Sequence, residues 1–155
     1  MNIENMPKLG FGLMRLPERD GEIDIPRVCA MVDTYMKAGF NYFDTAYIYH
    51  RGKSEEAVRE VLVRRYPREA FYLASKLPAW ELSSLEDRDR IFAAQLARTG
   101  AEYFDFYLLH SLEDGEHSET YTKFDCFRWA MQKKAEGRIK RFGFSYHGTP
   151  ELLEQ

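Results

Sequence analysis

Polar residues at a regular step mark the ends of four short apolar runs in this chain of 155 residues. The runs are rich in aromatic and branched side chains, as buried strands are. Their last polar residues lie 32, 34 and 35 residues apart: Asp44, Lys76, His110 and Ser145. Each step has the length of one strand–helix unit, and such units build parallel strands joined by right-handed crossovers. Because parallel strands end on the same side, we expect the four residues on one face.

The predicted strands share a short length and a β-branched or aromatic composition. They cover residues 8–13, 40–46, 70–76, 103–110 and 140–147. Amphipathic helical patterns lie between them, and a last helix is expected to open at Thr149-Pro150.

Local signals predict where the first two helices begin and end. Pro26 suits the first turn of the first helix, and Gly39 suits its carboxyl-terminal cap. Ser54 is expected to cap the second helix at its amino end, and Pro67 to stop it.

Two later helices are predicted from a cap and from a face. Ser83 and Glu86 have the spacing of a capping box, and the helix that they open is expected to run to Gly100. In the next helix, which is expected to end at Gly137, one side carries Phe124, Phe127 and Met131 and is expected to face the core.

The glycines separate two possible α/β architectures. A doubly wound nucleotide-binding sheet needs a glycine-rich turn that opens a helix, but Gly10 and Gly12 are followed by no third glycine and no helix start. A (β/α)8 TIM barrel fits the repeated units better. Such barrels typically need about 250 residues. The prediction is therefore a single partial barrel domain over residues 1–155, with about the first five strands and without the carboxyl-terminal ones.

Charge and hydropathy exclude two classes of partner. The 22 basic and 25 acidic residues are spread along the chain, so no basic face is expected for nucleic acid. No apolar run approaches the roughly 20 residues that span a bilayer, and no signal peptide is evident. We expect a cytoplasmic protein.

The two cysteines and four histidines do not predict a metal site. Cys29 and Cys126 lie far apart in the sequence and outside any metal-binding spacing, so both are expected to be buried free thiols. An alternative site would gather His50, His110, His147 and a cysteine around a metal. Their spacing is that of separate strand–helix units rather than of a compact ligand motif, so no metal is predicted.

Five ordered motifs give the chain a resemblance to a known family. They are FDTAYIY (43–49), SEEAVREVL (54–62), LASK (73–76), DFYLLH (105–110) and GRIKRFGFS (137–145). With these motifs in this order, the chain resembles the amino-terminal half, and a little more, of the barrel of the aldo-keto reductase family. The resemblance implies NAD(P)H-dependent reduction of aldehydes and ketones, with a catalytic tetrad at Asp44, Tyr49, Lys76 and His110.

The chemistry explains why those residue types are needed. Hydride attack on a carbonyl leaves negative charge on oxygen, which must receive a proton or a strong hydrogen bond. Tyr49 is the expected donor, because the ammonium of Lys76 would favour its phenolate. Asp44 would pair with that ammonium, and His110 would orient the carbonyl. Taken singly, each has a structural alternative, such as a helix cap for Asp44. Their joint occurrence favours catalysis.

The resemblance also implies cofactor contacts, with NADPH expected and NADH possible. Ser145 matches the position that hydrogen-bonds the nicotinamide carboxamide, and Gly12, Leu13 and Met14 match the first-strand loop near that ring. His50 replaces the glycine that frequently follows the catalytic tyrosine and is expected to alter that loop.

The substrate and the assembly are predicted only in outline. A small carbonyl compound is expected against an apolar wall of Tyr47, Trp80 and Tyr146. An open half barrel exposes apolar faces and strand edges, so the chain is expected to be a fragment or to self-associate. The alternative function is a non-catalytic or regulatory nucleotide-binding module on the same scaffold.

Overall fold

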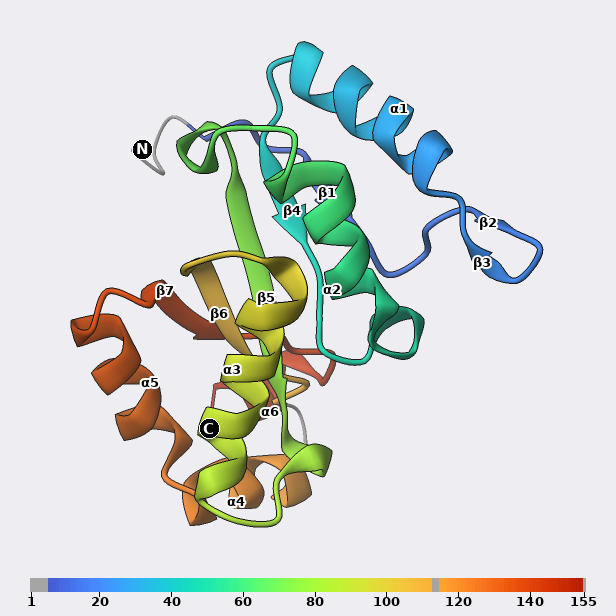
Figure 1. Ribbon diagram of the computed structural model, residues 1–155. Coiled ribbons are helices and arrows are strands. Elements are labelled where there is room, and N and C mark those ends of the chain that lie inside the picture. Colours follow the sequence, from blue (N-terminus) through green and yellow to red (C-terminus); the bar gives the residue numbers. More distant parts are fainter. Residues whose placement is uncertain (1–5, 113–114, 155) are drawn as a thin grey trace.

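Five parallel strands form one sheet in the computed structural model, which describes residues 6–112 and 115–154. The strands are β1 (Gly10–Gly12), β4 (Tyr42–Asp44), β5 (Tyr72–Pro78), β6 (Phe104–His110) and β7 (Ile139–Phe144). Their order in space, β1-β4-β5-β6-β7, follows the chain without reversal (Figure 1). A doubly wound sheet reverses its order at the ligand site, whereas a barrel does not. The predicted partial (β/α)8 barrel is confirmed.

Helices follow the strands and cover the sheet from outside (Figure 1). They are α1 (Ile25–Lys37), α2 (Lys53–Val58), α3 (Glu86–Thr99), α4 (Gly115–Lys123), α5 (Cys126–Ala135) and α6 (Pro150–Leu153). One π-helical turn (Arg59–Val63) continues α2, and 3-10 turns cover Tyr49–Gly52, Arg68–Ala70 and Ala79–Glu81. In the view of Figure 1, α1 lies on the β1 side and α5 on the β7 side.

The core lies between the sheet and these helices. All seven residues of β5 are buried, as expected for the middle strand of a parallel sheet. Leu73 and Tyr107 are fully buried strand residues of this core, and Val32, Leu62 and Ile91 are fully buried in the helical segments. Each such aliphatic or aromatic side chain contributes roughly 1.5–3 kcal/mol by leaving water.

The helix starts differ from the predicted caps. Ser54 lies inside α2, where its buried hydroxyl donates to Leu13 O at 3.0 Å, and Gly52 occupies the cap position. The predicted capping box at Ser83 is also wrong, because the side chain of Asp87 accepts the N–H groups of Ser83 and Ser84 instead. The Ser54 hydroxyl forms a tertiary hydrogen bond and the Ser83 amide forms a local one, so neither serine makes the predicted cap.

The predicted core face of the helix now seen as α5 is correct at Phe124, which is buried just before α5 begins, and wrong at Phe127 and Met131. Phe127 and Met131 are 46% and 52% exposed, and Cys126, Trp129 and Ala130 are the buried residues of α5. Among the described residues the sheet ends at β7, on which α5 packs. The Phe127 ring lies 6.2 Å from the ring of Phe142 in β7, but its outer side remains exposed.

Two elements had no counterpart in the sequence reading. An antiparallel hairpin of β2 (Glu18–Arg19) and β3 (Glu22–Ile23) lies between β1 and α1, and α4 follows β6. The residues between the hairpin strands, Asp20 and Gly21, both have positive φ, which suits a tight two-residue turn.

The described residues contain no helix that is both long and apolar enough to cross a membrane. Both cysteines are free thiols, as predicted, but only Cys126 is buried, and Cys29 is half-buried.

Candidate active site

The carboxyl ends of neighbouring strands bring the predicted residues together. The parallel register pairs Gly12 with Asp44 across β1 and β4, and Pro78 with His110 across β5 and β6. Ser145 follows the last residue of β7. The expectation that these side chains share one face is therefore met by the strand register, because all five strands run in the same direction.

A buried ammonium forms the centre of the site. Lys76 Nζ lies 2.6 Å from Asp44 Oδ1, 2.9 Å from the Thr45 carbonyl oxygen and 3.2 Å from Tyr49 Oη. Only 4% of Lys76 is exposed. A buried charge is costly unless it is paired, and removing one partner of a buried pair costs about 3–5 kcal/mol. Asp44 is thus the carboxylate that pairs with the Lys76 ammonium, as the sequence predicted.

His110 completes the group at the mouth of the sheet. Its ring lies 5.9 Å from the Tyr49 ring, centroid to centroid, and the residue is buried. Burial, the Lys76 charge and the nearby imidazoles of His147 and His117 lower the pKa of His110 to about 4. Its buried Nδ1 has no partner among residues 6–112 and 115–154. The imidazole is therefore neutral near pH 7 and keeps one N–H donor.

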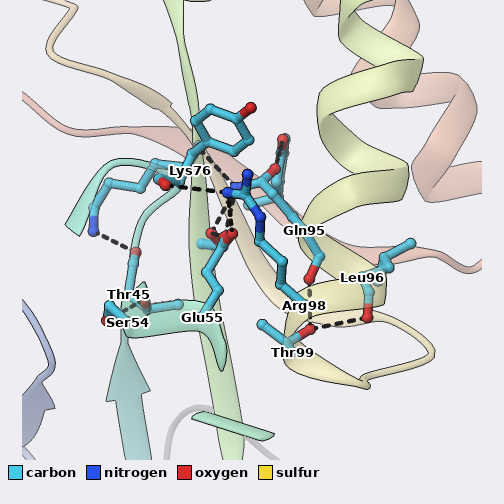
Figure 2. Close-up of polar contacts among 11 residues, drawn as sticks. Thr45, Ser54, Glu55, Lys76, Gln95, Leu96, Arg98 and Thr99 are labelled. Carbon is cyan, nitrogen blue, oxygen red and sulfur yellow. Dashed lines mark hydrogen bonds and ion pairs between the residues drawn. The ribbon is translucent and has the colours of Figure 1, made fainter. Parts of the chain in front are cut away.

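A fully buried polar network lies behind the ammonium (Figure 2). The Gln95 amide nitrogen lies 2.9 Å from Glu55 Oε1, 2.8 Å from Ser75 Oγ and 3.0 Å from the Lys76 carbonyl oxygen, so its two hydrogens are shared among three acceptors. The Tyr107 hydroxyl donates to Gln95 Oε1 at 2.5 Å, which fixes the orientation of the amide. The network thereby holds the backbone of Lys76 from the outer side of β5.

The carboxyl of Glu55 is the acidic member of this network. It is fully buried, and desolvation raises its pKa despite the hydrogen bonds from Ser75 and Gln95 and the charge of Arg98. Sequence reasoning missed Glu55, Ser75 and Gln95 as parts of the site. A usable signal was present, because Glu55 lies three residues before Val58 and seven before Leu62, on the helix face predicted to be buried.

Tyr47 does not lie with the predicted apolar wall. The Arg98 guanidinium lies 4.4 Å from the centroid of the Tyr47 ring, and Arg98 Nη1 also contacts the Tyr47 carbonyl oxygen at 3.4 Å. Arg98 therefore fixes the segment that leads into Tyr49. Trp80 fits the prediction better, since its ring lies 5.2 Å from that of His110 and 44% of the residue is exposed.

The loop after β1 presents two of its three predicted cofactor residues outward. Gly12 and Met14 are exposed, and a Cβ at Gly12 would meet no atom within 4 Å. Leu13 is fully buried in the core, and its N–H donates to Asp44 O at 2.8 Å. A flat ring can approach Gly12 closely, whereas Leu13 shapes the loop from behind.

The hydroxyl of Ser145 has a defined orientation. It accepts the Ser111 N–H at 2.8 Å, and the Ser145 N–H donates to Leu109 O at 2.9 Å. Since a hydroxyl has one donor and two acceptor positions, the O–H remains able to donate to another group.

No group of three or more His, Cys, Asp or Glu side chains could hold a metal ion in the part of the chain that the structure describes.

Comparisons with known proteins agree with this arrangement. The sequence model of the Aldo/keto reductase family matches residues 8–155. An aldo-keto reductase of Mycobacterium sp. (strain JLS) is 29% identical over 150 residues, which is 96% of this chain and 49% of that protein. The NAD(P)H-dependent D-xylose reductase XYR1 of Pyricularia oryzae is 36% identical over 115 residues, covering 68% of this chain and 31% of its own length.

Solved structures resemble the chain over the same extent. An aldo-keto reductase from Klebsiella pneumoniae, crystallised in complex with NADPH, has a TM-score of 0.72 and 27% identity. The match covers 96% of this chain and 48% of that one. The chain thus spans about half the length of the curated relatives in these matches. Because the family's sequence model matches residues 8–155, which is nearly the whole chain, the chain belongs to the aldo/keto reductase family.

Proposed function

We propose that the protein takes part in NAD(P)H-dependent reduction of aldehydes or ketones to alcohols, with Tyr49 as the proton donor. The observation that carries the proposal is the shared ammonium: Lys76 Nζ contacts Asp44 Oδ1 at 2.6 Å and Tyr49 Oη at 3.2 Å. A fixed positive charge beside the phenol oxygen stabilises the negative charge that appears there when the proton leaves.

The four side chains have complementary roles in this proposal. The nicotinamide cofactor supplies the hydride to the carbonyl carbon. As negative charge develops on the carbonyl oxygen, Tyr49 gives that oxygen its proton, and neutral His110 donates a hydrogen bond that orients it. Asp44 keeps Lys76 charged and in place.

The residues around the mouth fit a nicotinamide ring. Gly12 leaves space for its close approach, exposed Met14 lies two residues on, and Ser145 can donate its O–H to a carboxamide. We infer NADPH as the cofactor, with NADH as the alternative, because the similar Klebsiella pneumoniae structure holds NADPH.

A direct test of cofactor binding uses the two tryptophans. Trp80 is exposed beside His110, whereas Trp129 is buried in the core. Addition of NADPH is expected to quench Trp80 fluorescence saturably, and the Trp80→Phe variant is expected to lose that quenching. Saturable binding without turnover of any aldehyde or ketone would favour the nucleotide-binding module instead. A folded chain that binds neither NADPH nor NADH contradicts both functions for the isolated chain.

The Tyr49→Phe variant tests the proton donor. Loss of a positioned general acid is expected to lower kcat about 10²- to 10⁴-fold. The NADPH dissociation constant is expected to stay nearly unchanged, because the ring remains. Tyr47→Phe is the matched control, since the Tyr47 ring packs on Arg98 rather than at the site, and it is expected to keep nearly wild-type kcat. Equal rates for Tyr49→Phe and the wild type would exclude Tyr49 as the acid.

A further inference from the structure

The loop after Tyr49 has an unusual backbone. Three consecutive residues adopt positive φ: His50 (50°), Arg51 (57°) and Gly52 (88°). The left-handed region costs a non-glycine residue roughly 1–2 kcal/mol. Strain of this kind persists only where surrounding contacts hold it in place. The side chain of His50 makes such contacts.

The His50 imidazole connects two other segments to this loop. The Leu16 N–H donates to Nε2 at 2.9 Å, and Nδ1 lies 3.0 Å from Glu18 Oε1. Since a backbone N–H can only donate, Nε2 carries no proton, and Nδ1–H must donate to the Glu18 carboxylate. Only 11% of the imidazole side chain is exposed. The ring is thus held at both nitrogens.

The two anchored segments border the candidate site. Leu16 lies two residues after Met14, on the side where the nicotinamide is proposed to bind, and Glu18 begins the β2–β3 hairpin. A second contact between this hairpin and the loop region joins Lys53 Nζ to Glu22 Oε2 at 2.5 Å. Both partners of that pair are at least half exposed, and exposed pairs contribute little. His50 is therefore the stronger connection.

We propose that His50 is a positioning residue for the reduction: it ties the Tyr49 loop to the segment after β1 and to the β2–β3 hairpin, and so sets the phenol against Lys76. The inference rests on the proposed function, in which Tyr49 is the acid. It gives a reason for a histidine at a left-handed position, because the two side-chain hydrogen bonds offset the backbone cost. Glycine there would avoid the cost but make neither bond.

Three variants separate the imidazole from the backbone effect. His50→Gly removes both the ring and the left-handed strain. Arg51→Gly is the matched control, because it removes the strain of the next left-handed residue and leaves His50 in place. His50→Gln is the conservative rescue, since a glutamine side chain has one acceptor and one donor group, as the neutral imidazole has.

The expected results concern rate and local structure together. In His50→Gly, kcat at saturating NADPH and carbonyl is expected to fall about tenfold, since small displacements of reacting groups cost up to about 10²-fold. The Leu16 amide is expected to exchange its hydrogen faster, and the ring carbon resonances of ¹³C-labelled Tyr49 to shift. Arg51→Gly is expected to leave all three unchanged, and His50→Gln to recover most of the rate.

Two results would overturn the proposal. One is wild-type protection of the Leu16 amide in His50→Gly, which would mean that the ring holds nothing. The other is faster exchange with wild-type kcat and unshifted Tyr49 resonances, which would make the contact purely structural. If the wild type reduces no carbonyl, the proposed function fails by itself. The Tyr49 resonances of His50→Gly and Arg51→Gly then still decide whether His50 positions the phenol.

Discussion

At the scale of single residues, the site depends on the small number of groups that surround the buried Lys76 ammonium. Lys76 has a carboxylate, a carbonyl oxygen and a phenol around one ammonium, and the carboxylate is the only anion among these three. Asp44 therefore decides whether the buried charge is tolerated. The contact between Lys76 Nζ and the Tyr49 phenol oxygen is the longest of the three. It therefore depends most on the position of the loop that carries Tyr49.

The pKa of His110 leads to a prediction about stability. Burial, followed by the Lys76 charge, lowers this pKa to about 4 in the folded chain, whereas histidine in an unfolded chain has a pKa of about 6.5. Between about pH 6.5 and pH 4, His110 is protonated in the unfolded chain but remains neutral in the folded chain. The contribution of neutral His110 is thus complete above about pH 6.5 and decreases as the pH falls towards 4.

Urea unfolding at several pH values measures this effect. Between pH 7.5 and pH 5, the wild type is expected to lose more unfolding free energy than His110→Asn, which has no imidazole to protonate. Gln132→Asn, at an exposed position of α5 away from His110, is the control and is expected to keep the wild-type pH dependence. The same slope in His110→Asn and the wild type would mean that another group causes the acid sensitivity.

At the scale of elements, α2, β5 and α3 are joined by polar contacts as well as by apolar packing. Gln95 on α3 reaches Glu55 on α2 and both Ser75 Oγ and Lys76 O on β5. Buried polar groups of this kind are stable together but costly when one partner is removed. The outer side of β5 is therefore held by one amide.

Gln95→Leu tests that connection. The variant leaves the Glu55 carboxyl, the Tyr107 hydroxyl and the Lys76 carbonyl without this partner, so we expect a loss of about 2–4 kcal/mol of unfolding free energy. Chemical denaturation is the measurement. Gln132→Leu, at an exposed position of α5, is the matched control and is expected to change stability by about 0.5 kcal/mol or less. Equal stabilities for the two variants would mean that the network is dispensable.

The sequence predicted the strands more accurately than the helix starts or the hairpin. Strand positions were predicted to within a few residues, because a run buried on both faces carries a strong composition signal. Helix starts at Ser54 and Ser83 were predicted wrongly, because a serine near a helix start carries no information about a tertiary acceptor such as Leu13 O. The hairpin at residues 18–23 was missed because its strands are only two residues long.

At the scale of the whole molecule, the sheet is open at both ends. Among the described residues, β1 pairs only with β4, and β7 only with β6. Exposed apolar side chains lie near both edges: Leu9 and Met31 on the β1 side, and Phe127, Met131 and Phe144 on the β7 side. Open strands and apolar faces of this kind promote pairing with another chain.

We therefore expect the 155-residue chain to associate as its concentration is raised. Sedimentation velocity is the measurement. The double variant Phe127→Lys/Met131→Lys is expected to reduce association, because two charges would be desolvated in any contact through this face. Gln132→Lys, also on α5 and exposed, is the control and is expected to leave it unchanged. A monomer at every accessible concentration would contradict the prediction.

The sequence by itself determined the strand order, the side of the sheet on which the polar strand ends lie, and the residue types of the site. It could do so because a repeated strand–helix unit permits one handedness, and parallel strands end together. The tertiary structure alone decided which contacts hold the site and the segments around it: Gln95 with Lys76, Arg98 with Tyr47, and His50 with Leu16. These contacts join residues from 19 to 51 positions apart, and their side chains meet only after the helices have packed on the sheet.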